Sequence, residues 1–200
     1  MTVSKSIGLV NWSNDGRRRG VDRRMNETTI SVPDLNGLQS GELLERLGHL
    51  YEHTPWIVRD ALAQRPFASR LAFQDALSAT VRNADPAAKL ALIREHPDLV
   101  GDAALRGTLT RASVDEQTAA GLSADDLSDD EREMFRRLNA TYRDTFGFPF
   151  VICARDNRKV SILDGFDARL RNDRETEIET ALGEIEKIAA YRLFDIMTDE

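Results

Sequence analysis

The sequence is poor in the residues that build several common kinds of site. It contains one cysteine in 200 residues, which excludes an internal disulfide framework and favours a reducing compartment. It contains only three histidines, and it has neither a glycine-rich phosphate loop nor a G-x-S-x-G motif. There is no run of about eighteen apolar residues, and the N-terminus lacks the order of a secretory signal. We therefore expect a cytoplasmic protein that does not enter a membrane.

Positive charge is also in short supply. The chain has 27 lysines and arginines against 34 aspartates and glutamates, for a net charge of −7. Because the acidic residues are interspersed, no basic stripe for nucleic-acid phosphates is expected. The 41% hydrophobic content is ordinary for a globular protein, so a small molecule or another protein is the expected partner.

The composition divides the chain into a tail and one domain. Residues 1–38 show no sustained periodicity and are predicted to be a disordered basic tail, and residues 39–200 are predicted to be a single helical domain. The tail carries a group of five arginines: Arg17, Arg18, Arg19, Arg23 and Arg24. One alternative is a basic arm for an acidic partner. Another is that translation starts at Met25.

Apolar residues recur at helical spacing through the rest of the chain. Eight helices are predicted, beginning near Ser40, Thr54, Ser69, Asp85, Ser113, Ser128, Val160 and Arg174. Residues 148–154 are predicted to be short and extended, because a proline two residues after a glycine cannot continue a helix. With no strand to pair with this segment, the fold class is all-α, a compact bundle of about eight helices.

Two residues stand out as candidates for chemistry. His96 lies where a helical pattern ends at Pro97, and an imidazole titrates near neutral pH; its alternative role is a C-terminal helix cap. Arg192 lies on the apolar stripe of the last helix, after Ile185 and Ile188. A guanidinium there pairs with a buried carboxylate, faces an anion in a cavity, or extends its head to water.

Other candidates have plainer interpretations. Glu116 stands three residues after Ser113 and is predicted to close a capping box. His49 and His53 are four residues apart, but no H-E-x-x-H motif or third histidine accompanies them, so a zinc site is not predicted. Cys153 has no basic neighbour in sequence and is predicted to be a small buried residue.

Several segments, taken together in order and spacing, resemble one enzyme family. They are Glu52–Pro55, Gln64–Phe67, His96–Leu99, Leu105–Thr110, Ser113–Gln117, Ala120–Leu122, Leu138–Tyr142 and Phe146–Arg155. The chain from about Leu43 to Leu193 resembles the decarboxylases of 2-oxo-4-hydroxy-4-carboxy-5-ureidoimidazoline (OHCU), the last enzymes on the path from urate to S-allantoin. The tail and the absence of a C-terminal Ser-Lys-Leu signal depart from some members.

The resemblance implies a cofactor-independent, metal-free, all-α homodimer that binds a ureidoimidazoline. It implies catalytic residues at His96, Glu116 and Arg192. It implies substrate contacts at Pro97, Ser113, Val114, Asp115, Glu116, Gln117, Phe150, Val151, Ile152, Cys153 and Ala154.

The chemistry agrees with these implications. Loss of CO₂ from C4 leaves an electron pair that the adjacent ring C=N accepts, so the remaining tasks are orientation and proton delivery. His96 is expected to transfer the proton, Glu116 to orient the hydroxyl or the imidazole, and Arg192 to hold oxygens that stay on the ring. Backbone groups of residues 150–154 are expected to bind the urea edge. Alternatives are a hydrolase or isomerase of a related ureido-ring intermediate, and a non-enzymatic helical interaction module.

Overall fold

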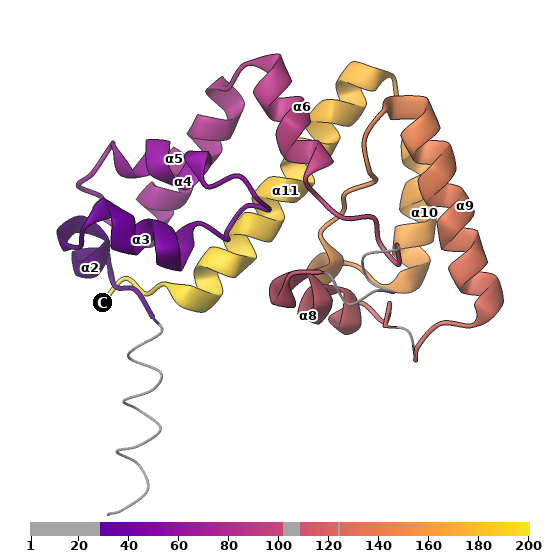
Figure 1. The fold of residues 1–200 in the computed structure, drawn as a ribbon, viewed down its shortest axis with the longest axis horizontal. Coiled ribbons are helices and arrows are strands. Elements are labelled where there is room, and N and C mark those ends of the chain that lie inside the picture. Colours follow the sequence, from indigo (N-terminus) through magenta and orange to yellow (C-terminus); the bar gives the residue numbers. More distant parts are fainter. Residues whose placement is uncertain (1–28, 102–108, 124) are drawn as a thin grey trace, which may run out of the picture.

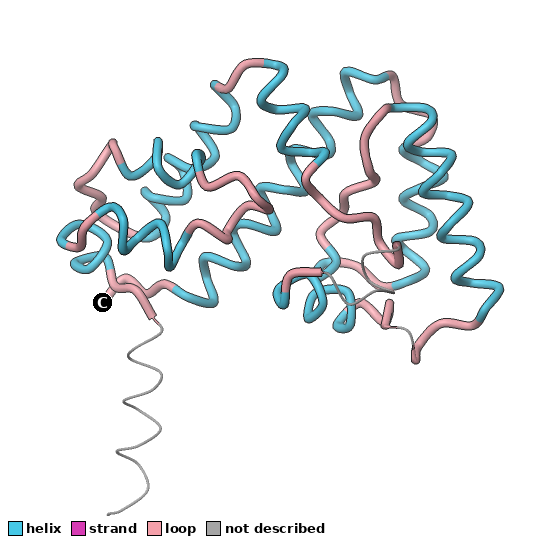
Figure 2. The backbone as a smooth tube through the Cα atoms, viewed as in Figure 1, coloured by secondary structure: helices cyan, strands magenta, loops and turns pink. Residues whose placement is uncertain are grey.

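The computed structural model describes residues 29–101, 109–123 and 125–200. The predictions for the first 28 residues, the Met25 alternative included, and most of the Leu105–Thr110 loop fall outside these ranges. Within them the chain forms nine α-helices and one short 3₁₀ helix. In Figure 2 the described backbone is helix and loop, without a sheet. The predicted all-α class is confirmed.

The helices are short except for the last one and α9. Their bounds are α2 Val32–Gly37, α3 Ser40–Leu47, α4 Trp56–Leu62, α5 Arg70–Asn83, α6 Pro86–Arg94, α8 Arg111–Ala119, α9 Asp129–Phe146, α10 Lys159–Arg169 and α11 Arg174–Ile196, with the 3₁₀ helix η1 at Ala154–Asp156. Eight of the nine α-helices correspond to the helices predicted from the sequence; α2 was not predicted. No described helix combines the length and the apolar character needed to cross a bilayer.

Three of the eight predicted helix starts are confirmed by the predicted side-chain caps. The N-cap side chains that accept a backbone N–H as predicted are Ser69, Asp85 and Ser128. The predicted cap at Thr54 is wrong, because α4 begins one residue later with Pro55 at its N-cap and no side-chain cap. The Thr54 hydroxyl is buried, and no described residue hydrogen-bonds it.

The predicted boundary of the tail at residue 38 is too late. Helix α2 begins with a capping box between Ser31 and Asp34, and it buries Leu35 completely. Ile30 is buried too, and its backbone N–H donates to the carbonyl of Ile196 at 2.8 Å. Residues 1–38 are mostly polar, so their overall composition does not reveal these few apolar residues. They join the core by contact with the C-terminal end of the chain.

Helix α11 crosses the whole fold (Figure 1). It packs against α5 and α6, and its C-terminal end returns to the first described residues. Its buried stripe includes Leu182, Ile185, Ile188 and Arg192, which confirms the apolar stripe predicted from sequence. The stripe therefore carries a guanidinium into the interior.

The segment before η1 is extended and held by side chains rather than by a sheet. Arg169 donates to the carbonyl of Val151 at 2.7 Å, and the N–H of Cys153 donates to Glu184 at 2.8 Å. The ring of Phe150 stacks on Phe166 with centroids 3.8 Å apart. These contacts fix the path of the segment past helix α11.

Candidate active site

Four parts of the chain meet at one small pocket: the end of α6, helix α8, the extended segment and α11. The lining residues are His96, Pro97, Leu99, Ser113, Glu116, Gln117, Val151, Ile152, Ala154, Ile188 and Arg192. The structure thus brings together nine of the thirteen residues that the sequence singled out. The open space is about 40 Å³, little more than one water molecule occupies, so a ring-shaped ligand needs the pocket to widen.

The other four predicted residues place their side chains elsewhere. Val114 and Asp115 are exposed on α8. Phe150 lies in the aromatic core, stacked on Phe166. Cys153 is buried, and burial raises the pKa of its thiol to about 11, so the thiol is not activated as a nucleophile.

The predicted capping box at Ser113 is wrong, because helix α8 begins at Arg111. Thr110 is its N-cap, and the Thr110 hydroxyl accepts the N–H of Ser113 at 3.3 Å. Glu116 therefore sits inside the helix with its carboxylate free for another partner. That partner is Arg192, whose Nε and Nη2 donate to the two oxygens of Glu116 at 3.0 and 2.9 Å. The pair has the two-pronged geometry that suits a guanidinium and a carboxylate.

A second buried carboxylate, Glu52, meets the same guanidinium. Its Oε1 accepts from Arg192 Nη2 at 2.9 Å and from the Ser113 hydroxyl at 2.7 Å. Burial alone would raise the pKa of Glu52, but the Ser113 hydrogen bond and the charge of Arg192 outweigh it and lower the pKa below its ordinary value. Sequence reasoning did not single out Glu52 as a site residue; its place in the Glu52–Pro55 segment of the family resemblance was the available signal.

Arg192 binds this cluster through Nε and Nη2, and its Nη1 donates to the carbonyl of His49 at 3.4 Å. Only 5% of the residue is exposed, so the alternative that its head extends to water is wrong. Burial opposes its charge, but the two glutamates more than compensate and raise the pKa of Arg192. One guanidinium between two carboxylates gives the buried cluster a net charge of −1.

His96 directs one ring nitrogen at the protein and leaves the other for the pocket. Nδ1 lies 3.1 Å from the carbonyl oxygen of Leu92, in the last turn of α6. Because a carbonyl only accepts, Nδ1 carries the hydrogen, and in the neutral ring Nε2 is the basic nitrogen. The predicted capping contact and a chemical role are therefore compatible. Burial lowers the pKa of His96 to about 4, so the ring is neutral at neutral pH.

The low pKa of His96 predicts a pH-dependent stability. The unfolded chain, with the ordinary value of 6.5, binds a proton more readily than the folded chain at about 4. The free energy of unfolding should therefore fall as the pH decreases through this window, with a His96 contribution on the order of 3 kcal/mol. Urea unfolding at a series of pH values should show a shallower slope for His96→Gln than for the wild type. Equal slopes would mean that His96 is not buried as a neutral ring.

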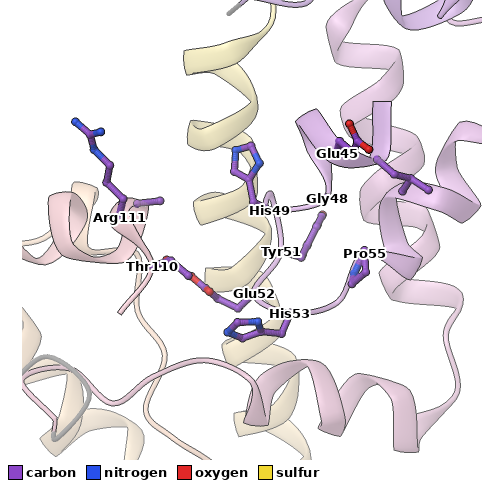
Figure 3. Close-up of a pocket in the computed structure, with 11 residues that line it drawn as sticks. Glu45, Gly48, His49, Tyr51, Glu52, His53, Pro55, Thr110 and Arg111 are labelled. Carbon is purple, nitrogen blue, oxygen red and sulfur yellow. The ribbon is translucent and has the colours of Figure 1, made fainter. Parts of the chain in front are cut away.

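A larger cavity of about 500 Å³ lies beside the pocket (Figure 3). His49, His53, Glu52 and Thr110 line it. Glu52 and Thr110 also hydrogen-bond the hydroxyl of Ser113, which lines the small pocket. Within the part of the chain that the structure describes, no three metal-binding side chains are grouped closely enough to hold an ion. The cavity is therefore the alternative to the small pocket as a ligand site.

The chain is similar to known proteins of one enzyme family. The sequence profile described as OHCU decarboxylase matches residues 36–194. A 2-oxo-4-hydroxy-4-carboxy-5-ureidoimidazoline decarboxylase of Halalkalicoccus jeotgali is 37% identical over 169 residues, which cover 84% of this chain and 93% of that relative. The Xenopus laevis decarboxylase of the same name is 34% identical over 171 residues, covering 86% and 97%.

A solved structure gives the same result. The crystal structure of an (S)-allantoin synthase matches with a TM-score of 0.64 and 29% identity, covering 84% of this chain and 54% of that chain, so this chain spans about half of that protein. The matched residues 36–194 include the four parts of the chain that form the pocket. The chain belongs to the OHCU decarboxylase family.

Proposed function

We propose that this protein decarboxylates 2-oxo-4-hydroxy-4-carboxy-5-ureidoimidazoline to S-allantoin in urate catabolism, without a cofactor. The observation that carries the proposal is the meeting of His96, Glu116 and Arg192 in one buried pocket of a chain from this family. A titratable ring, a carboxylate and a guanidinium are the groups needed to orient a polar heterocycle and to move one proton.

The roles follow from the geometry. Arg192 holds oxygens that remain on the ring, because gripping the departing carboxylate would stabilise the ground state and slow the reaction. Glu116 fixes the guanidinium through two hydrogen bonds and orients the substrate hydroxyl. Nε2 of His96 exchanges the proton, since Nδ1 is held by Leu92. The ring C=N accepts the electron pair, so this mechanism asks for no separate electron sink.

The backbone of residues 150–154 contributes less than the sequence suggested. The carbonyl of Val151 is taken by Arg169, and the N–H of Cys153 is taken by Glu184. The carbonyl of Cys153 accepts from Asn157. Among the described residues none hydrogen-bonds the N–H or C=O of Ile152, which lines the pocket. We therefore propose Ile152, whose N–H and C=O are both available, as the urea contact.

Glu116→Gln tests the role of the carboxylate. The helix start is secured by Thr110, so no cap is lost and the fold should persist. Turnover should fall about 10- to 100-fold, because the amide replaces one charge-assisted hydrogen bond to Arg192 with a poorly matched N–H. Steady-state assays should use Glu179→Gln, on the solvent side of α11, as the matched control. Full activity in the Glu116 variant would remove this residue from the mechanism.

The proposed reaction is tested with freshly generated OHCU. CO₂ release and the circular dichroism of the product are followed with and without enzyme. We expect faster CO₂ release and a single enantiomer, S-allantoin. A hydrolase or isomerase would consume the substrate without releasing CO₂, and an interaction module would leave the uncatalysed rate and a racemic product unchanged; either result rejects the proposal.

We also propose a cytoplasmic homodimer. Exposed apolar side chains on α5 and α11, Leu71 and Phe194, support an interface because both line one surface groove. Sedimentation equilibrium should give twice the chain mass of 22.5 kDa, and a single-chain mass would reject the dimer.

A further inference from the structure

The proposed reaction consumes a proton, which the site must supply. A carboxylate that leaves as CO₂ gives up its negative charge, and the carbon skeleton left behind gains one proton, so each turnover consumes one proton. The C4–carboxylate bond breaks, its electron pair forms the C4=C5 bond, and the ring C=N pair moves to nitrogen. The C4 hydroxyl then becomes a carbonyl as its proton passes to that nitrogen, and the new C–H bond at C5 takes one further proton from the pocket. The question is when that proton enters.

In the empty pocket, His96 does not carry this proton. Nδ1–H is held by the Leu92 carbonyl at 3.1 Å, and the neutral ring presents only a lone pair at Nε2. The residue is only 5% exposed, and burial keeps its pKa near 4. At neutral pH the ring is a base in the empty site, although the reaction asks it to act as an acid.

The charged groups around His96 explain how substrate binding makes protonation of the ring favourable. Glu52, Arg192 and His53 act on the ring electrostatically from other parts of the chain, and Glu116 lines the same pocket. The two carboxylates and one guanidinium sum to −1. Arg155 lies 4.0 Å from Glu116, but it is paired with Asp195 at 2.5 Å and adds no free positive charge. A substrate carboxylate would bring the pocket to −2 in surroundings from which water is largely removed.

We propose that the anionic substrate brings a proton into the site, onto Nε2 of His96, and that CO₂ loss releases this proton to the ring carbon. This inference rests on the proposed function. The substrate carboxylate stabilises the imidazolium, and loss of neutral CO₂ moves the negative charge from the carboxylate onto the ring, which is a much stronger base. The imidazolium then transfers its proton to C5 at the moment when the ring can accept it. Substrate binding thus generates the imidazolium that later acts as the acid.

Two features favour His96 over the glutamates as the acceptor. Glu52 accepts from Arg192 and Ser113, and Glu116 accepts two hydrogen bonds from Arg192, so protonating either carboxylate weakens existing contacts. Protonating Nε2 breaks no contact among the described residues and keeps Nδ1–H on Leu92. The ring gains a donor directed at the ligand.

Isothermal titration calorimetry of the full chain measures the proton directly. Hydantoin-5-acetate carries a ring and a carboxylate that does not leave as CO₂, and it is titrated near pH 7.5 in two buffers of different ionisation enthalpy. We expect uptake of about one proton per bound ligand, and none for neutral (S)-allantoin. Zero uptake with the bound carboxylate, or equal uptake with both ligands, overturns the inference.

Variants identify the acceptor. His96→Gln should abolish the uptake, whereas His49→Gln, which alters an exposed histidine of the neighbouring cavity, should preserve it. Uptake that persists in His96→Gln assigns the proton elsewhere and overturns the proposal. If His96→Gln does not fold, ¹⁵N shifts of labelled wild-type histidine give the answer: the His96 ring should become doubly protonated with hydantoin-5-acetate, and an unchanged neutral ring contradicts us.

Stopped-flow mixing with fresh OHCU and a pH indicator separates this inference from the proposed function. Proton uptake should precede CO₂ release. If CO₂ forms first and uptake follows it, the enzyme is still a decarboxylase and only this inference fails. If no CO₂ forms, the proposed function itself fails.

Discussion

His96→Gln should lower the turnover of OHCU by about 10²- to 10⁴-fold, the contribution expected of one positioned acid or base. Glutamine keeps an N–H for the Leu92 carbonyl, so helix α6 retains its last contact and the fold should persist. The allantoin formed should become close to racemic, because water then delivers the proton to both faces of the ring. Initial rates and circular dichroism of the product measure the two effects together.

His49→Gln serves as the matched control for this experiment. His49 is exposed and its side chain borders the neighbouring cavity, so its variant should match the wild type in rate and stereochemistry. A His96→Gln enzyme that keeps wild-type turnover and still makes one enantiomer would exclude His96 as the proton-transfer group.

Substitution of Arg192 should have the largest effect on stability. Arg192→Met leaves Glu52 and Glu116 as two buried carboxylates without their shared partner, which should cost about 3–5 kcal/mol of unfolding free energy. Arg192→Lys keeps the charge but not the planar fork, so turnover should fall about 10- to 100-fold with a smaller loss of stability. Urea unfolding and steady-state kinetics on both variants measure these effects.

Arg82→Lys is the control, because that exposed arginine on α5 forms only a surface ion pair with Glu186. It should change neither quantity appreciably. If Arg192→Lys retained full activity, the bidentate contact of the guanidinium would not contribute to catalysis, and Arg192 would be a structural residue.

The helices were predictable because each carries its own local signals. Ser69, Asp85 and Ser128 cap their helices through side chains that the sequence displays directly. Helix α2 was missed because six residues give too short a period to detect, and its burial depends on contact with the far end of the chain. Thr54 failed as a cap because Pro55 takes the N-cap position itself.

The site was predictable in part. The position of Arg192 on an apolar stripe left a buried carboxylate, an anion in a cavity or water as its possible partner, and the structure shows Glu116 as the carboxylate. The capping-box interpretation of Glu116 failed because Thr110 and Ser113 are both capable caps, and only the structure shows which one begins the helix. Glu52 was not found because its role comes from a contact across 140 positions of the chain, which no local pattern reveals.

A crystal structure with (S)-allantoin tests the central claim most directly, because the small pocket and the larger cavity compete for the ligand. We predict that allantoin lies in a widened small pocket, with a ligand oxygen within about 2.7–3.2 Å of the Arg192 guanidinium and the ring beside Nε2 of His96. Allantoin bound instead in the cavity of His49 and His53, with Arg192 still closed on Glu52 and Glu116, would contradict the account.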